Sequence, residues 1–271
     1  IYQKTEDNLT MDTPAGKTGD MSGTEVTLKT GWNFIGSPYP FKVALQLDQV
    51  QFYGPLTYGI SGESWSPVIT ELDPWNGYVV YNRMSTDQVI TLDPSVSSNT
   101  TAVRKVEESG WLMSLSLSSG DHGDHINALG ALETAENGLE WHDNPEIRSP
   151  GAGVSLFFKL EDEALELTSD IRSLDQQVKL WDMHVRSDTD SDVDLSWSVV
   201  QDLPADVDIR LVDLSTRNVI NMKDETQLSL GALDPRYDRR VKIVAGEESE
   251  VAARIGDVLS MIPDQLSISG N

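Results

Sequence analysis

Residues 111–118 alternate between apolar and polar side chains, and this alternation constrains the fold more than any other feature of the chain. The odd positions, from Trp111 to Leu117, are apolar, and three of the even positions are serine. Residues 193–199 repeat the pattern. A period of two residues is typical of a β-strand that buries one face and exposes the other. These two segments therefore predict sheets with one buried and one wet face.

Further short segments rich in β-branched and aromatic residues are bounded by Gly, Pro and Asn, as strands usually are. They arrive at spacings typical of an antiparallel sandwich. The sequence thus predicts an all-β fold of two consecutive antiparallel β-sandwich-like modules with flexible linkers. The predicted strands are 26–28, 32–35, 78–81, 89–92, 154–160, 178–185, 207–212, 219–222, 228–230 and 241–244.

Two segments carry helix formers instead. Residues 127–137 contain Ala128, Leu129, Ala131 and Leu132, which predict a short helix. A second, weaker helical stretch is expected over 251–262.

Polar stretches without a hydrophobic period divide the chain and predict its domain boundaries. Thr, Asp, Gly and Lys dominate the first such stretch, and Ser, Asn and Thr dominate the second, around 95–101. The expected organisation is a leader or linker at 1–23, a small aromatic-rich β module at 24–98, a linker at 99–102, a larger β-sandwich at 103–246 and a C-terminal linker at 247–271.

The charge of the chain excludes several partners. Its 44 acidic and 20 basic residues give a formal charge of −24. Because nucleic acids and anionic membranes attract lysine and arginine, neither is an expected partner. The acidic surface instead favours solubility, capture of divalent cations at clustered carboxylates, or life in high salt.

Residue types and segments that the sequence lacks exclude further kinds of site. The chain has no cysteine, so disulfides, thiolate metal sites and cysteine nucleophiles are excluded. No apolar run approaches the ~20 residues that a membrane helix needs. Because the chain begins at Ile1 rather than Met, we expect a processed product or a piece of a longer protein.

A series of short motifs lies between residues 111 and 243. In order they are Trp111–Leu115, Asp124–Gly130, Asn137–Glu146, Gly153–Phe158, Asp170–Arg172, Leu180–Val185, Asp194–Trp197, Arg210–Leu214 and Arg239–Ile243. This series resembles a module of large secreted proteins from Bacteroidota and related phyla, which lies directly before a C-terminal sorting domain of the type IX secretion kind. Gly31–Tyr39 looks like the module that often precedes it, and Ile262–Asn271 resembles the lead into the sorting domain. The proline cluster expected after Glu146 is reduced to Pro150.

This resemblance implies a non-catalytic structural or adhesive module of a secreted or cell-surface bacterial protein. Its partners would be the remainder of a longer surface polypeptide or neighbouring copies, and its location extracellular or at the cell surface. The sequence also lacks a Gly-x-Ser-x-Gly elbow and a phosphate-binding glycine loop, so no catalytic residue is assigned and we do not expect an enzyme.

Two other functions stay open. Trp65, Trp75 and Tyr78 could stack on sugar rings, which would make the chain a carbohydrate-binding ancillary module of a secreted hydrolase with glycans as partners. The alternative is that these aromatics form the core of a small module, which has few other sources of stability. The second open function is a self-assembling extracellular filament, in which Ile1–Thr10 adds as a strand to a neighbouring copy.

The motif Asp121, His122, Asp124 and His125 packs two imidazoles and two carboxylates into five residues. Histidine with carboxylate is a legitimate ligand set for zinc or similar ions. The structural alternative is a polar surface loop whose acids stabilise the neighbouring histidines.

Asp188, Asp190 and Asp192 alternate as the first ligands of a calcium loop do. The template then fails, since it needs glycine and glutamate where the chain has Val193 and Val199. The run is more simply an acidic turn leading into the strand at 193–199. We therefore assign no metal or cofactor, and calcium is the one ion that the sequence leaves open.

Overall fold

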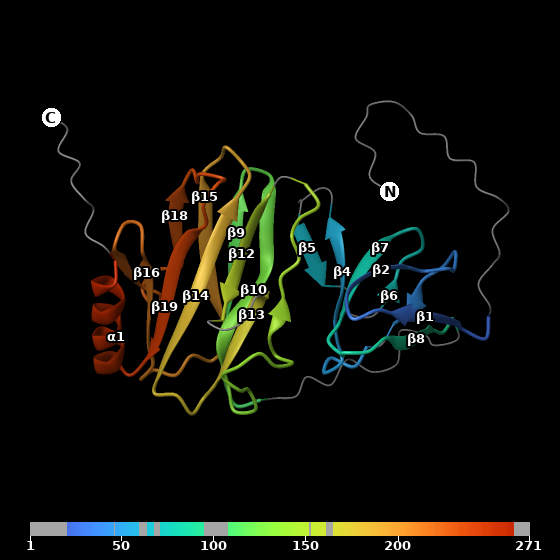
Figure 1. Ribbon diagram of the computed structural model, residues 1–271, viewed down its shortest axis with the longest axis horizontal. Helices are drawn as coiled ribbons and strands as arrows, with labels where there is room; N and C mark the ends of the chain where they lie inside the picture. The colour runs from blue at the N-terminus through green and yellow to red at the C-terminus, as the bar shows by residue number, and fades with distance from the viewer. Residues whose placement is uncertain are drawn as a thin grey trace.

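A computed structural model describes residues 21–45, 47–59, 64–67, 71–94, 108–151, 153–160 and 165–262. These residues form nineteen β-strands and one helix, so the prediction of an all-β chain is confirmed (Figure 1). Two large hydrophobic cores are present, one formed by residues before 94 and the other by residues after 108, and a third, small cluster is formed by Leu132, Ala135 and Ile171. We call these parts the N-terminal unit (residues 21–94) and the C-terminal unit (residues 108–262). The predicted boundary at 99–102 lies outside the described residues.

The N-terminal unit contains three small antiparallel sheets. The largest has the order β2-β7-β4-β5, and the other two pair β1 with β8 and β3 with β6. The strands are β1 Thr24–Leu28, β2 Gly31–Gly36, β3 Val43–Ala44, β4 Phe52–Gly59, β5 Ser64–Pro67, β6 Glu71–Leu72, β7 Gly77–Asn82 and β8 Gln88–Leu92.

Alternate residues of β7 face opposite sides of the four-stranded sheet. Tyr78 and Val80 lie in the core of the N-terminal unit. On the other side, Trp32 meets Tyr53 and Tyr81 edge to face, with ring centroids 6.0 and 5.1 Å apart. The sheet therefore has a second, aromatic face directed away from its own core.

The C-terminal unit is built on one large sheet that curls around its core (Figure 1). The strand order is β17-β16-β19-β14-β12-β13-β10-β9-β15-β18, with β11 paired to β13. All pairs are antiparallel except β10 with β13. The strands are β9 Gly110–Ser119, β10 His122–Leu132, β11 Asn144–Pro145, β12 Val154–Lys159, β13 Glu166–Ser173, β14 Val178–Ser187, β15 Val193–Gln201, β16 Asp208–Asp213, β17 Asn218–Asn221, β18 Gln227–Gly231 and β19 Arg239–Gly246.

The alternating segments lie where their pattern predicts. Trp111, Met113, Leu115 and Leu117 of β9 are each at most 2% exposed and belong to the core inside the curl. The core is held by polar contacts too, since the indole of Trp181 donates a hydrogen bond to the Asp170 carbonyl over 3.0 Å.

The helix predicted at 127–137 is wrong, because most of this segment belongs to strand β10. Leu129 and Ala131 alternate into the core, and Gly130 lies so close to β9 that an added Cβ would be 2.3 Å from the Trp111 carbonyl oxygen. Packing between strands thus overrides the helix propensity of alanine and leucine.

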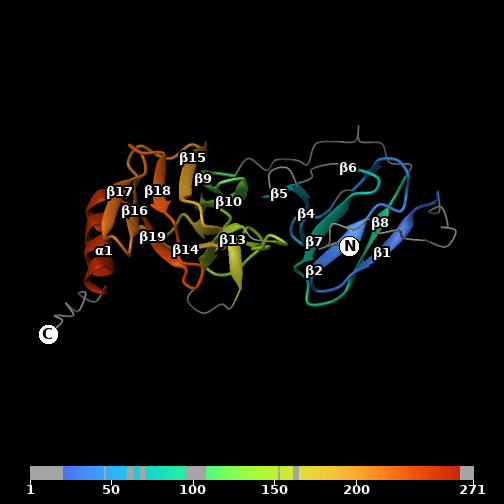
Figure 2. The same cartoon turned by 90° about the horizontal axis from the view of Figure 1, so that it is seen from above.

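The helix expected near 251–262 is present as α1, Glu248–Ser260. Its Val251 and Val258 are buried, and the helix packs against β14, β16 and β19. The segment predicted as a C-terminal linker therefore includes a helix that is part of the C-terminal unit. Figure 2 shows α1 at the end of the molecule farthest from the N-terminal unit. Residues 263–271 and the predicted leader up to residue 20 lie outside the described part.

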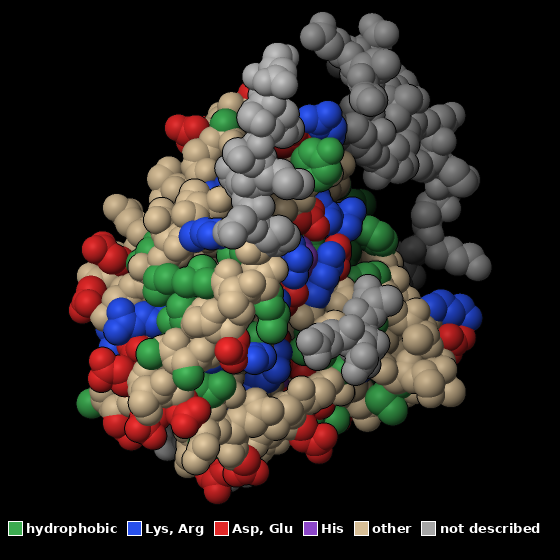
Figure 3. Space-filling model, turned by 60° about the vertical axis from the view of Figure 1, so that its left-hand side comes forward, with side chains coloured by type: hydrophobic (Ala, Val, Ile, Leu, Met, Phe, Trp, Pro, Cys, Tyr) green, Lys and Arg blue, Asp and Glu red, His purple; other side chains and the backbone are tan. Residues whose placement is uncertain are grey.

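On the face seen in Figure 3, acidic side chains are visible in many places and are interspersed with lysine and arginine. The negative charge is thus spread over this face rather than gathered in one patch.

Candidate functional site at the junction of the two units

The three aromatic candidates lie in three different surroundings. Tyr78 is 2% exposed, and its hydroxyl accepts a hydrogen bond from the Asp73 amide over 2.6 Å. Trp65 is partly buried, packs edge to face with Tyr58 and donates from its indole nitrogen to the Arg148 carbonyl of the C-terminal unit over 3.2 Å. Only Trp75 is open to solvent, at 90% exposure. Two of the three aromatics therefore have structural contacts, and they do not form one stacking surface.

The Asp-His motif lies at the hairpin between β9 and β10. Asp124 is buried and its Oδ2 accepts a hydrogen bond from the Leu156 amide over 2.7 Å, whereas His125 is exposed. Adjacent residues of a strand point to opposite faces, which separates this carboxylate from the neighbouring imidazole. Within the described ranges, no three His, Cys, Asp or Glu side chains lie close enough together to hold a metal ion.

Asp188, Asp190 and Asp192 lie in the turn between β14 and β15, and all three are exposed. Thr189 between them is tied to the hairpin of β9 and β10, because its hydroxyl lies 2.6 Å from that of Ser119. The turn is thus held by a neutral side chain while its acids face solvent.

A site that the sequence did not single out lies where the two units meet. Arg83, which follows β7, donates from Nη1 to the Asp143 carbonyl over 2.7 Å and from Nη2 to the Asn144 side-chain oxygen over 2.5 Å. The indole of Trp65 donates the third of these hydrogen bonds, to the Arg148 carbonyl. Strand β5 of the N-terminal unit also lies against β10 of the C-terminal unit. The acceptors all belong to the segment between β10 and β12, and we call its described residues 133–151 the junction segment.

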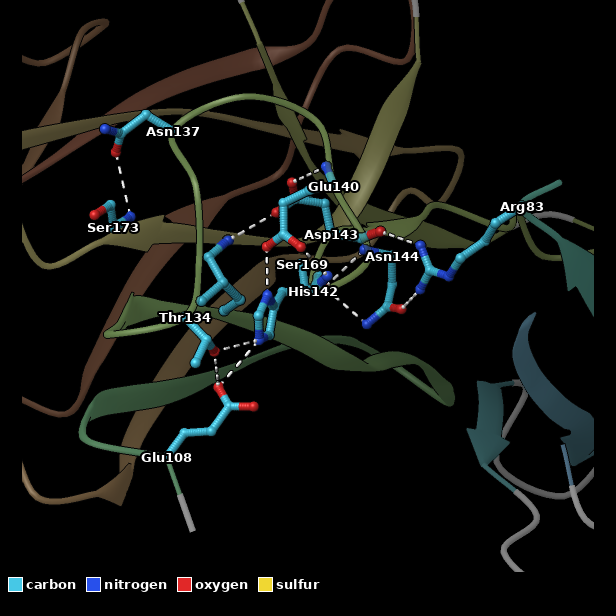
Figure 4. A network of polar contacts seen from close by, with 11 residues as sticks. Arg83, Glu108, Thr134, Asn137, Glu140, His142, Asp143, Asn144, Ser169 and Ser173 are labelled. Carbon is cyan, nitrogen blue, oxygen red and sulfur yellow. Dashed lines mark hydrogen bonds and ion pairs between the residues drawn. The ribbon is translucent and has the colours of Figure 1, made fainter. Parts of the chain in front are cut away.

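A polar network holds the junction segment in place (Figure 4). His142 lies between two carboxylates: its Nε2 is 3.0 Å from Glu108, and its Nδ1 contacts Glu140. Asn144 donates from its backbone and its side chain to the Ser169 hydroxyl over 2.9 and 2.8 Å. The two acceptors of Arg83, the Asp143 carbonyl and the Asn144 side chain, therefore belong to a segment held by its own hydrogen bonds.

Electrostatics within this network follow from burial. Desolvation raises the pKa of Asp143 to about 7, although its carboxylate accepts hydrogen bonds from the Ile171 and Glu140 amides over 2.9 and 3.0 Å. For His142, burial lowers the pKa, but the contacts with Glu140 and Glu108 outweigh burial and the net shift is upward.

A second acidic group lies on the same side of the C-terminal unit. The charge of Asp124, from β10, raises the pKa of Glu146, which follows β11. The charges of both carboxyls raise the pKa of Tyr53 in the N-terminal unit. Burial, reinforced by the two carboxyls, raises the pKa of Tyr53. Nothing in the sequence distinguishes Glu146 from the other acidic residues, so only the fold reveals this pair.

Comparisons with known proteins add no further assignment. No helix in the part of the chain that the structure describes is both long and apolar enough to span a membrane. No family model, curated protein or solved structure matches the chain.

Proposed function

We propose that this chain is a non-catalytic structural module of a secreted or cell-surface bacterial protein. It consists of two consecutive β-sandwich-like modules that act as a spacer for a longer surface polypeptide or for neighbouring copies. The proposal is supported by the separate cores of the two units and by the motifs that resemble modules preceding a type IX sorting domain.

The observation that carries the proposal is the pair of hydrogen bonds from Arg83. A planar guanidinium that donates to two acceptors fixes orientation as well as distance. Its acceptors are a backbone carbonyl and a side chain that is itself bound to Ser169. Such a contact suits a spacer, whose two units must keep one relative orientation under load.

The orientation of the units can be measured directly. Because the chain lacks cysteine, Val89→Cys and Val199→Cys place one spin label on each unit at positions that are 59% and 51% exposed. Pulsed electron resonance then reports the distance between the labels. We expect one narrow distance, which Arg83→Ala broadens and which Arg236→Ala, an exposed arginine in another loop, leaves unchanged.

A broad distribution in the doubly labelled parent chain would refute the spacer. The proposed location is tested separately, by adding protease to intact producing cells. Survival of the protein under conditions that degrade other surface proteins would contradict a surface location.

Glycan binding is a second candidate because Trp75 is 90% exposed and has a φ of +68°, which is costly for a bulky residue. Binding to a glycan array that is lost in Trp75→Ala but kept in Phe34→Ala, where an 82% exposed aromatic is removed, would support it. The absence of any binding by the parent chain would refute it. The filament alternative depends on Ile1–Thr10, which lie outside the described residues.

A further inference from the structure

His142 occupies a closed polar site in which two carboxylates approach its imidazole from opposite sides (Figure 4). Its Nε2 lies 3.0 Å from Oε2 of Glu108, which precedes strand β9, and its Nδ1 contacts Oε1 of Glu140. The side chains of His142, Glu108 and Glu140 are only 6%, 11% and 13% exposed. The Thr134 hydroxyl completes the site, because it donates to Glu108 Oε2 over 2.8 Å and lies 3.3 Å from His142 Nε2.

The number of protons on the imidazole decides whether both carboxylates can be bound. A neutral imidazole carries a single N–H, so its other nitrogen presents a lone pair. Whichever nitrogen that is, the lone pair faces a carboxylate oxygen, and two acceptors in contact repel each other. The Thr134 hydroxyl does not relieve this repulsion at Nε2, because its one proton is donated to Glu108. Only the doubly protonated imidazole donates to both glutamates.

The surroundings of the imidazole favour this doubly protonated form. Burial lowers the pKa of His142, and the contacts with Glu140 and Glu108 outweigh burial. The ring of Trp141 adds to this preference, since its centroid lies 3.6 Å from that of the imidazole and an aromatic face attracts a cation. Asp143 and Arg83 act on the charge of Glu140, but neither forms an ion pair with His142 among the described contacts.

Loss of one proton affects the two glutamates differently. Glu140 is held in its own turn, since its Oε2 accepts a hydrogen bond from the His142 amide and its carbonyl accepts one from the Asp143 amide, both over 3.1 Å. The remaining proton therefore stays on Nδ1, where it is donated to Glu140, because the hydrogen bond at one ring nitrogen selects the tautomer. The lone pair then lies on Nε2, opposite Glu108. The contact that is lost is thus the one between segments distant in sequence.

From this geometry we infer that His142 is a proton-operated clasp, which holds the junction segment against Glu108 while the imidazole is doubly protonated and releases Glu108 when one proton is lost. The inference does not depend on the spacer function. The clasped form binds the second proton more tightly than the open form does. Its stability is therefore present below the ordinary pKa of histidine, about 6.5, and is lost as the pH rises through the raised pKa of His142.

Two measurements on the full chain test the clasp. An NMR titration follows the His142 imidazole, whose signal is assigned among the four histidines by its loss in His142→Gln. We expect a pKa above 6.5. Amide hydrogen exchange of residues 133–142, corrected for its intrinsic dependence on pH, then reports opening between pH 6 and pH 9. The ratio of open to closed molecules should rise by up to about tenfold per pH unit between the ordinary and the raised pKa, and then level off.

The decisive variant is Glu108→Gln. The glutamine amide can donate to the lone pair on Nε2, so the contact forms with a neutral imidazole and no longer needs the second proton. The corrected exchange should then be independent of pH, and the pKa of His142 should fall toward its ordinary value. Glu136→Gln is the matched control, because it removes one acidic charge from an exposed position of the junction segment and should respond as the parent does.

A pKa of His142 at or below 6.5 would overturn the inference, as would corrected exchange that stays constant from pH 6 to pH 9 in the parent chain. A pH response that persists in Glu108→Gln would overturn it too. If Glu108→Gln does not fold, His142→Gln takes its place in the exchange measurement, because a side chain that does not titrate should also remove the pH response.

Discussion

Replacing Arg83 by alanine should weaken the docking of the two units, and the loss of docking free energy can be assessed from the hydrogen bonds that are removed. The guanidinium makes two hydrogen bonds to the junction segment, of 2.7 and 2.5 Å. A hydrogen bond from a charged group contributes about 1.5–3 kcal/mol net. Burial lowers the pKa of Arg83 despite the neighbouring Asp143, which indicates a desolvation cost. We therefore take the lower limit and expect Arg83→Ala to weaken docking by about 3 kcal/mol in total.

Urea unfolding measures this loss, because an undocked N-terminal unit should unfold in a separate, earlier transition. A double-mutant cycle with Asn144→Ala isolates one of the two hydrogen bonds and should give a coupling energy of about 1.5 kcal/mol. Arg236→Ala serves as the control and should leave the transition where it is. A coupling below about 0.5 kcal/mol, within the usual error of additivity, would refute the reasoning.

Three more substitutions test the fold. Gly130→Ala should destabilise the C-terminal unit and lower Tm, because the new Cβ would lie 2.3 Å from a backbone oxygen of β9; Gly138→Ala, with nothing within 4 Å, should leave Tm unchanged. Trp75→Gly should raise the free energy of unfolding by about 1 kcal/mol by relieving a left-handed backbone, and an equal or lower Tm would contradict this. For Asp213, burial alone would raise the pKa, but Arg239 at 2.6 Å and further hydrogen bonds lower it. The stability from this carboxylate is therefore present above its ordinary pKa and lost as the pH falls through its lowered pKa in the folded chain. Asp213→Asn should thus be less stable than the parent in urea at pH 7, and the difference should shrink as the pH falls.

Local patterning predicted strands that bury one apolar face, and it failed where the buried side chains are polar. Strand β13 was missed because its Thr168, Ser169 and Asp170 look like loop residues, yet each is at most 3% exposed. Their burial is stabilised by partners that are distant in sequence, such as Asn144 for Ser169 and Asn127 for Thr168. A hydrophobic period contains no information about such contacts.

The candidate sites show the same limit. Asp124 and His125 are neighbours in sequence, but they belong to a strand and so face opposite sides. Conversely, no pattern in the sequence links Arg83 with Asp143, and the two residues meet only because the two units contact each other, with β5 lying against β10. Spacing along the chain predicts proximity but not the direction in which a side chain points.

The position of β19 has a consequence for how the C-terminal unit acquires its structure. Among the described strands, β19 is the last along the chain, yet it lies between β14 and β16 and bonds to both. A nascent chain that ends before Arg239 would lack the link that joins β16 and β17 to the rest. Because these pairings connect distant parts of the polypeptide, assembly is expected to be slow and to be completed only after synthesis has passed Gly246.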